Sequence, residues 1–122
     1  MPEVTDRRKR RSSDPIVALH YQLEAIRRDS RLEALVLVDE SGFMVAGAGA
    51  WPVCEEVAAY APLLATGEDF HASYDVRSAR VHSFRLDGAT ALLCAQGEQA
   101  RQDLGWIERS TSGCQRILSA QA

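Results

Sequence analysis

The sequence lacks the long apolar run that a membrane-spanning helix requires. No window of its 122 residues approaches the roughly 18 apolar residues needed to cross a bilayer. Cysteine is scarce: Cys54, Cys94 and Cys114 are odd in number and widely spaced, which indicates neither a disulfide framework nor a zinc module. The length suffices for one domain with a real core and not for two. With 46% apolar and 25% charged residues, the composition is that of an ordinary globular chain.

Motifs that carry chemistry are absent as well. Ser41-Gly42 lacks the glycine that precedes the serine of a nucleophile elbow. The segment 47–52 begins like a dinucleotide fingerprint, but Pro52 stands where the third glycine belongs. No cysteine or histidine pair has the close spacing of a metal loop, and the cysteines fall on apolar stripes, where thiols serve as small hydrophobes. We therefore predict a chain that is not an enzyme, with no catalytic residue, no cofactor and no metal site.

Charge is unevenly distributed along the chain. Residues 1–14 hold five basic and three acidic side chains, a net charge of +2, whereas the remainder holds nine basic and fourteen acidic side chains, a net charge of −5. An acidic body is a poor ligand for phosphate, so no nucleic-acid partner is expected. Ser12 and Ser13 follow the basic run, where a secretory signal would have apolar residues. With unpaired thiols in addition, we expect a cytoplasmic location.

The basic residues near the N-terminus form one run with nothing apolar to bury. Like charges repel, so residues 1–13 are predicted to be a disordered tail that precedes one domain over residues 14–122. Such a run could bind an anionic membrane, nucleic acid or an acidic partner. We favour a solvated tail. Its basic side chains could still contact an acidic surface; they are Arg7, Arg8, Lys9, Arg10 and Arg11.

Hydrophobic periodicity divides the rest of the chain into helices and strands. Asp14-Pro15 opens an amphipathic helix at roughly 15–29. An apolar strand at 34–38 and its return at 43–46 are joined by a short turn, which makes the pair an antiparallel hairpin. The expected elements that follow are a helix at 52–66, a half-buried strand at 70–76, strands at 79–86 and 89–95, and a helix at 98–119.

The second hairpin predicts how the sheet is covered. Asp87-Gly88 is a strong turn signal. Pairing of its strands places Phe84, Leu86, Ala91 and Leu93 on one face and Val81, Leu92 and Cys94 on the other, so both faces are covered. In the last helix the predicted apolar stripe is Leu104, Ile107, Cys114, Ile117 and Leu118, with Gly105 and Gly113 marking close packing or a bend. The predicted fold is an α/β (α+β) sandwich with a single antiparallel five-stranded sheet, element order α-β-β-α-β-β-β-α, and helices on both faces.

The helix predicted at 52–66 is unusual because residues 57–65 carry no charge. A helix that is apolar all round must be covered all round. Val53, Val57, Tyr60, Ala61 and Leu64 can face one side while Cys54, Ala58 and Ala65 face another, and Pro62 is expected to kink the helix. A second apolar face is most simply covered by another copy of the chain. If the following strand lies at the sheet edge, Phe70 and Tyr74 join the same contact.

The chain resembles the roadblock/dynein light-chain domain family. The resemblance spans about residues 15–120 and is carried by the hairpin at 35–46, the helix at 56–65, the segment 81–97 with its Asp-Gly turn, and Asp103-Leu104-Gly105. It implies a profilin- or longin-like architecture and a homodimer in which the central helices pack together and neighbouring strands extend the two sheets into one. It further implies a scaffold or regulator that binds a Ras-like small GTPase.

Two functions of different class follow. The first is the homodimeric, non-catalytic regulator of a Ras-like GTPase that acts by contact and biases the GTPase switch segments. The second is a small-molecule sensor, because a sheet covered on both faces can enclose a ligand. A sensor requires a closed apolar cavity with convergent polar groups, whereas a scaffold requires a solid core and a helix face left for a partner. We favour the scaffold, with its interface at Val53, Val57, Tyr60, Ala61, Leu64, Phe70 and Tyr74.

Overall fold

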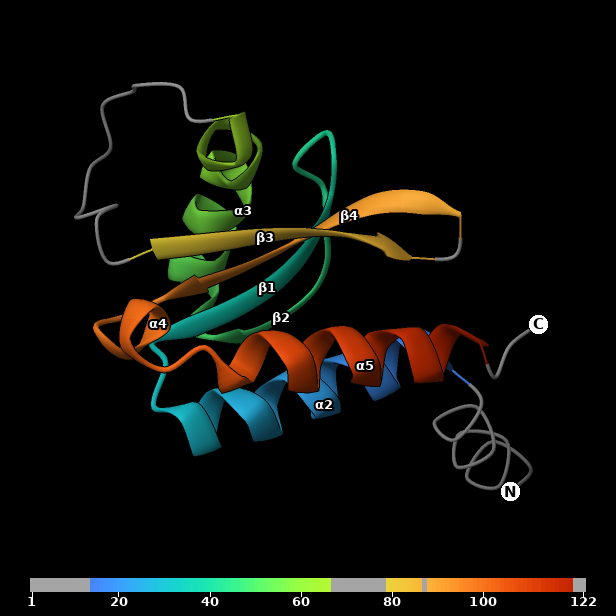
Figure 1. Ribbon diagram of the computed structural model, residues 1–122, viewed down its shortest axis with the longest axis horizontal. Coiled ribbons are helices and arrows are strands. Elements are labelled where there is room, and N and C mark those ends of the chain that lie inside the picture. The colour runs from blue at the N-terminus through green and yellow to red at the C-terminus, as the bar shows by residue number, and fades with distance from the viewer. Residues whose placement is uncertain (1–13, 67–78, 87, 120–122) are drawn as a thin grey trace, which may run out of the picture.

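Three layers make up the protein in its computed structural model, which describes residues 14–66, 79–86 and 88–119 (Figure 1). The middle layer is an antiparallel sheet of four strands in the order β2-β1-β4-β3. Helix α3 covers one face, and helices α2 and α5 cover the other. The strand expected at 70–76 lies outside the described residues, so the described sheet has four of the five predicted strands. Among the described helices, none combines the length and apolar character needed to cross a bilayer.

Helix α2 spans Pro15–Ser30, as the Asp14-Pro15 pattern predicts. The Asp14 carboxylate accepts a hydrogen bond from the Ile16 N–H at 3.0 Å, which satisfies one of the free donors at the helix start. The helix ends at Arg31, whose backbone adopts the left-handed conformation with φ 57°. Its apolar stripe of Leu19, Leu23 and Ile26 is fully buried against the sheet.

The first hairpin consists of β1 (Ala34–Asp39) and β2 (Met44–Gly49). Strand β1 is central and buried on both faces, which explains its continuous apolar sequence. Strand β2 is longer than expected, because backbone pairing of Ala34 with Gly49 continues through residues predicted to form a loop. At the turn, the Asp39 carboxylate accepts hydrogen bonds from the N–H groups of Ser41 and Phe43 at 2.9 and 3.0 Å.

The second hairpin consists of β3 (Ala79–Leu86) and β4 (Ala89–Gln96), in agreement with the prediction. Its alternation divides the core into two clusters, one on each face of the sheet. Phe84, Leu86, Ala91 and Leu93 belong to the cluster under α2 and α5. Val81, Leu92 and Cys94 belong to the cluster under α3. The predicted assignment of side chains to faces is therefore confirmed.

The single helix predicted at 98–119 is wrong: the chain forms α4 (Gln99–Gln102) and α5 (Gly105–Ser119). At the break, the Asp103 carboxylate accepts a hydrogen bond from the Gly105 N–H at 3.0 Å. Leu104 is 42% exposed instead of contributing to the stripe, and the fully buried Trp106 takes its place. Gly113 marks close packing as expected, because a Cβ there would lie 2.6 Å from the Gln22 side chain of α2.

Candidate protein interface on α3 and the sheet edge

Helix α3 (Trp51–Thr66) runs continuously through Pro62 and packs on the sheet through Cys54, Val57, Ala58 and Ala61. The sequence placed Cys54 and Ala58 on one side of the helix and Val57 and Ala61 on another. All four pack on the sheet, so the helix is divided into faces differently from the prediction. Val57 and Ala61 are buried in the core of this chain. Among the predicted interface residues of the helix, Val53, Tyr60 and Leu64 remain half-buried.

Val53, Tyr60 and Leu64 lie on one flank of α3, since they are separated by seven and four residues. Pro62 lies on the opposite flank and faces the first hairpin: a Cβ at Gly42 would lie 3.3 Å from the Pro62 Cγ. The flank of Tyr60 is therefore the one turned toward β4 and β3. The Tyr60 hydroxyl donates a hydrogen bond to the Glu56 carboxylate at 3.2 Å, which anchors the ring along the helix.

The two edges of the described sheet differ in how they are covered. At β2, the Nδ1 atom of His20 lies 2.9 Å from the Gly47 oxygen and 3.3 Å from the Gly47 nitrogen. The imidazole thus satisfies one polar group of this edge residue at a time: a protonated Nδ1 donates to the Gly47 carbonyl, and a bare Nδ1 accepts from the Gly47 N–H. No sequence pattern singled out His20 for this role, because the contact spans 27 positions in the chain.

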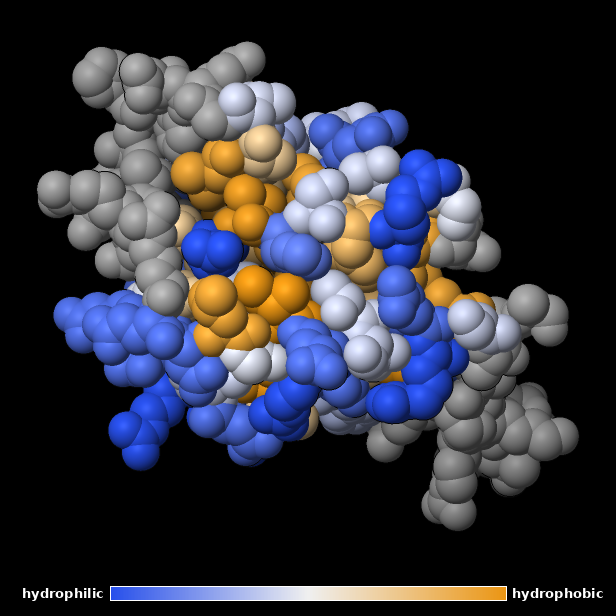
Figure 2. Space-filling view, in the orientation of Figure 1, coloured by the Kyte–Doolittle hydropathy of each residue, from blue (hydrophilic) through white to orange (hydrophobic). Residues whose placement is uncertain are grey.

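Strand β3 forms the other edge of the described sheet, and its side chains are mostly half-buried or exposed. Figure 2 shows hydrophobic residues on both sides of this strand, toward α3 and toward α5, with hydrophilic residues between them. The strand itself carries the exposed Arg80, Ser83 and Arg85. Phe70 and Tyr74, the strand residues predicted to join the interface, lie outside the described residues.

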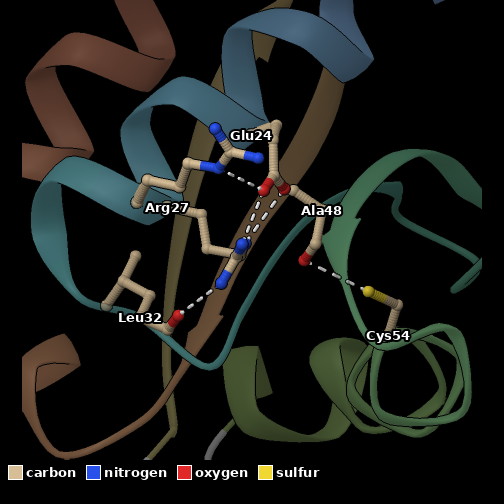
Figure 3. Close-up of polar contacts among 6 residues, drawn as sticks. Glu24, Arg27, Leu32, Ala48 and Cys54 are labelled. Atoms are coloured by element: carbon tan, nitrogen blue, oxygen red, sulfur yellow. Dashed lines mark hydrogen bonds and ion pairs between the residues drawn. The ribbon is translucent and has the colours of Figure 1, made fainter.

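A polar cluster joins the end of α2 to the start of β1 (Figure 3). The Glu24 carboxylate accepts hydrogen bonds from the Arg27 and Arg28 side chains, and the Arg27 Nη1 atom donates to the Leu32 carbonyl at 3.2 Å. The hydrogen bond from Arg27 and the positive charge it brings lower the pKa of Glu24. Each of these groups already has its partner, so the cluster holds the α2–β1 connection and has no free acid or base for chemistry.

The three thiols are buried, and burial raises the pKa of each. The value for Cys94 rises to about 12 and that for Cys114 to about 11. The Cys54 thiol donates to the Ala48 carbonyl at 3.3 Å (Figure 3). Protonated, enclosed thiols are poor nucleophiles and poor metal ligands. Within the part of the chain that the structure describes, no three His, Cys, Asp or Glu side chains come together as a metal site would need.

An open hollow of about 410 Å³ lies where the end of α2 meets the β4–α4 connection. Charged side chains of Arg31, Glu33 and Glu98 line it, and Leu32 is its one large apolar lining residue. This hollow is not the enclosed apolar cavity that a small-molecule sensor would require.

Comparison with known proteins identifies the fold. No protein-family model matches the sequence. No curated protein matches it either. Among solved structures, Myxococcus xanthus MglB superposes with a TM-score of 0.52 over 88% of this chain and 92% of that chain, at 16% sequence identity. A likeness at this identity concerns the fold, and it confirms the roadblock-type architecture that the sequence resemblance implied.

Proposed function

We propose that this protein is a homodimeric, non-catalytic scaffold or regulator that binds a Ras-like small GTPase and modulates its activity or placement. The observation that carries the proposal is the fold shared with MglB, a roadblock-domain GTPase regulator, over most of both chains. Fold alone is an argument by analogy, so the surface of this chain has to supply the rest.

The flank of α3 with Val53, Tyr60 and Leu64 supports the dimer. It consists of half-buried apolar and aromatic side chains beside β3. Strand β3 forms one edge of the described sheet, and His20 covers the other edge at β2. A two-fold contact would complete the burial of Leu64 and Tyr60 on both copies at once. Val53 and Leu64 already pack partly against the core, so a dimer would continue a surface that is largely preformed.

The regulator would act by contact. The polar groups of the α2–β1 cluster are paired, and the thiols are buried and protonated, so the GTPase would have to supply the chemistry of hydrolysis. The dimer would bias the switch segments of the GTPase or hold it at a location. Phe70 and Tyr74 remain part of the proposed interface as neighbours of β3 in the sequence.

Leu64→Asp tests the interface, with Ala59→Asp as the control on an exposed position outside the Tyr60 flank. Light scattering should give twice the 13.4 kDa of one chain for the wild type and for Ala59→Asp. In Leu64→Asp the dissociation constant should rise about 30-fold or more, because an unpaired carboxylate in the contact costs ~2 kcal/mol or more.

GTPase binding is measured on the same three proteins with a Ras-like GTPase from the source organism, in its GTP- and GDP-bound forms. Binding by the wild type and its loss in Leu64→Asp are the expected results. A wild type that stays monomeric at tens of micromolar contradicts the dimer. A dimer that binds neither form of the GTPase contradicts the partner and leaves the interface intact.

A further inference from the structure

The loop between β1 and β2 presents the most exposed large apolar side chain of the described residues, Phe43, at 73% exposure. Its position is well defined. The Asp39 carboxylate holds the N–H groups of Ser41 and Phe43, and the Asp39 N–H donates to the Phe43 carbonyl at 3.0 Å. The loop also passes close to α3, since a Cβ at Gly42 would lie 3.3 Å from the Pro62 Cγ and 3.4 Å from the Ala58 carbonyl oxygen. The hydrogen bonds of Asp39 hold the ring in one presented position, and such preorganisation lowers the cost of binding a partner.

The stretch of chain that holds this ring carries charge of a single sign. Residues 39–66, which form the loop, β2 and α3, hold Asp39, Glu40, Glu55 and Glu56 and not one lysine, arginine or histidine. Glu40 is exposed, three residues before Phe43 in the same loop, and forms no ion pair with any residue that the structure describes. An aromatic face next to an unpaired carboxylate is the surface that an arginine side chain fits, because guanidinium groups stack on rings and bind carboxylates.

The chain itself carries the complementary segment. Residues 7–11 are Arg-Arg-Lys-Arg-Arg, five consecutive positive charges, and they end three residues before Asp14, the cap of α2. The segment 32–66, by contrast, has five acidic and no basic residues. Charge complementarity thus relates one end of the sequence to one surface of the fold.

The contacts of α2 relate that end to β2, the strand that follows the loop. His20 of α2 contacts Gly47 of β2, and further along α2 the Arg27 side chain reaches the Leu32 carbonyl beside β1, whose Ala34 pairs with Gly49 at the end of β2. Helix α2 and strand β2 therefore run in the same direction. Asp14 lies six residues before His20, and Phe43 lies four residues before Gly47, so both lie on the same side of the His20–Gly47 contact along their elements. In Figure 1 the start of α2 belongs to the layer below the sheet, and the β1–β2 loop rises on the α3 side.

The length of the segment limits which of its residues can reach the loop, because the chain must also pass around the β2 edge of the sheet. From their contact, α2 extends about 9 Å back to Asp14 and β2 about 13 Å back to Phe43. The seven residues from Asp14 back to Arg7 span up to about 25 Å when extended. We propose that the basic segment Arg7–Arg11 docks on the surface formed by Glu40, Phe43 and the Pro62 flank of α3 in its own chain, where it pairs with the carboxylates and covers the ring. The contact is independent of the proposed GTPase function.

The test compares the full chain with a variant in which Arg7, Arg8, Lys9, Arg10 and Arg11 are all replaced by glutamine. Backbone amide resonances of residues 40–43 should differ between the two proteins at low ionic strength. The difference should disappear at high salt, because the screening length falls from about 30 Å at 0.01 M to about 3 Å at 1 M. Resonances of the α4–α5 corner, residues 99–106, which lies at the other end of the molecule from the start of α2, should coincide in both proteins and show that the fold is unchanged.

Matched variants locate the receiving surface. Glu40→Gln and Phe43→Ala should each reduce the shift difference to half or less. Glu108→Gln and Leu104→Ala, which alter an exposed carboxylate and an exposed apolar residue elsewhere, should leave it unchanged. Equal effects of the two pairs would overturn the assignment of the surface.

Two results would overturn the proposal as a whole. One is coincidence of the residue 40–43 resonances in the wild type and the five-glutamine variant at low salt. The other is a shift at these residues in an isotope-labelled five-glutamine chain on mixing with unlabelled wild type, which would assign the contact to a second copy. Neither readout depends on a GTPase, so failure here and failure of the proposed function are separate results.

Discussion

Two glycines show two different reasons why a position in this fold requires a residue without a side chain. Gly49 and Gly88 both have positive φ, 114° and 83°, a region that L-residues rarely adopt. Their surroundings differ. A Cβ at Gly49 would lie 2.5 Å from the Glu33 carbonyl oxygen, whereas a Cβ at Gly88 would meet nothing within 4 Å. The conformational requirement is shared, and the steric requirement belongs to Gly49 alone.

Alanine at each position separates the two requirements. Gly88→Ala should lower the free energy of unfolding by about 1–2 kcal/mol, the cost of a left-handed conformation. Gly49→Ala should lower it by about 3 kcal/mol or more, because the start of β1 must also move away. Urea denaturation of the two variants and the wild type measures both effects. Equal losses would show that the close approach at Glu33 is relieved without cost.

At the scale of elements, the α4–α5 corner is set by one buried aromatic residue. The Trp106 indole N–H donates to the Ala100 carbonyl at 3.0 Å, and the ring is almost completely buried. This contact joins the end of α4 to the first turn of α5 and closes the break at Asp103. The second tryptophan, Trp51, stands 50% exposed at the start of α3, with its ring centroid 6.5 Å from that of His20.

Replacing each tryptophan by phenylalanine compares these two environments. Trp106→Phe should lower the free energy of unfolding by about 2 kcal/mol, because it leaves the buried Ala100 carbonyl without a donor and opens space in the core. Trp51→Phe should change it by less than about 0.5 kcal/mol. Chemical denaturation followed by circular dichroism serves both variants, since tryptophan fluorescence differs between them. A loss in Trp51→Phe as large as that in Trp106→Phe would contradict this account of the corner.

At the scale of the whole molecule, the sheet separates two apolar clusters that share its strands. β1 and β4 contribute alternate residues to both, which couples the α3 layer to the α2–α5 layer. The buried thiols lie in both clusters: Cys54 and Cys94 belong to the cluster between α3 and the sheet, and Cys114 of α5 belongs to the other. Their titration therefore reports on the integrity of the whole fold.

Burial of the thiols predicts a loss of stability at alkaline pH. The pKa of Cys94 is raised from 9.0 to about 12, so its contribution is complete below pH 9 and falls as the pH rises from 9 toward 12. For one thiol the free energy of unfolding then falls by up to about 1.4 kcal/mol per pH unit. Urea denaturation at several pH values above 9 should show a shallower decline for Cys94→Ala than for the wild type. Parallel declines would mean that Cys94 ionises as readily in the folded chain as in the unfolded one.

Several features of this fold followed from local pattern alone. The alternation around Asp87-Gly88 assigned the side chains of β3 and β4 to the correct faces, because strand periodicity leaves only two choices and the turn sets the pairing. Asp14-Pro15 located the start of α2 because both residues act on the backbone next to them. The candidate interface could be predicted only in part. An uncharged helix indicates that several of its sides are buried, but it does not indicate which side meets the sheet and which side meets a partner.

The sequence by itself determined the start of α2, the two hairpins and the presence of an apolar central helix, since these depend on contacts within a few residues. Only the tertiary structure decided which side of α3 meets the sheet. Val57 and Ala61 are buried while Tyr60 and Leu64 stay half-buried, because packing selects one face from residues of nearly equal hydrophobicity. It also decided the break before α5 and the covering of β2 by His20. The break is held by hydrogen bonds within the corner, from Gly105 to Asp103 and from the buried Trp106 to Ala100. The His20 contact depends on where residues 27 positions apart lie after the layers have packed, a quantity that no local pattern contains.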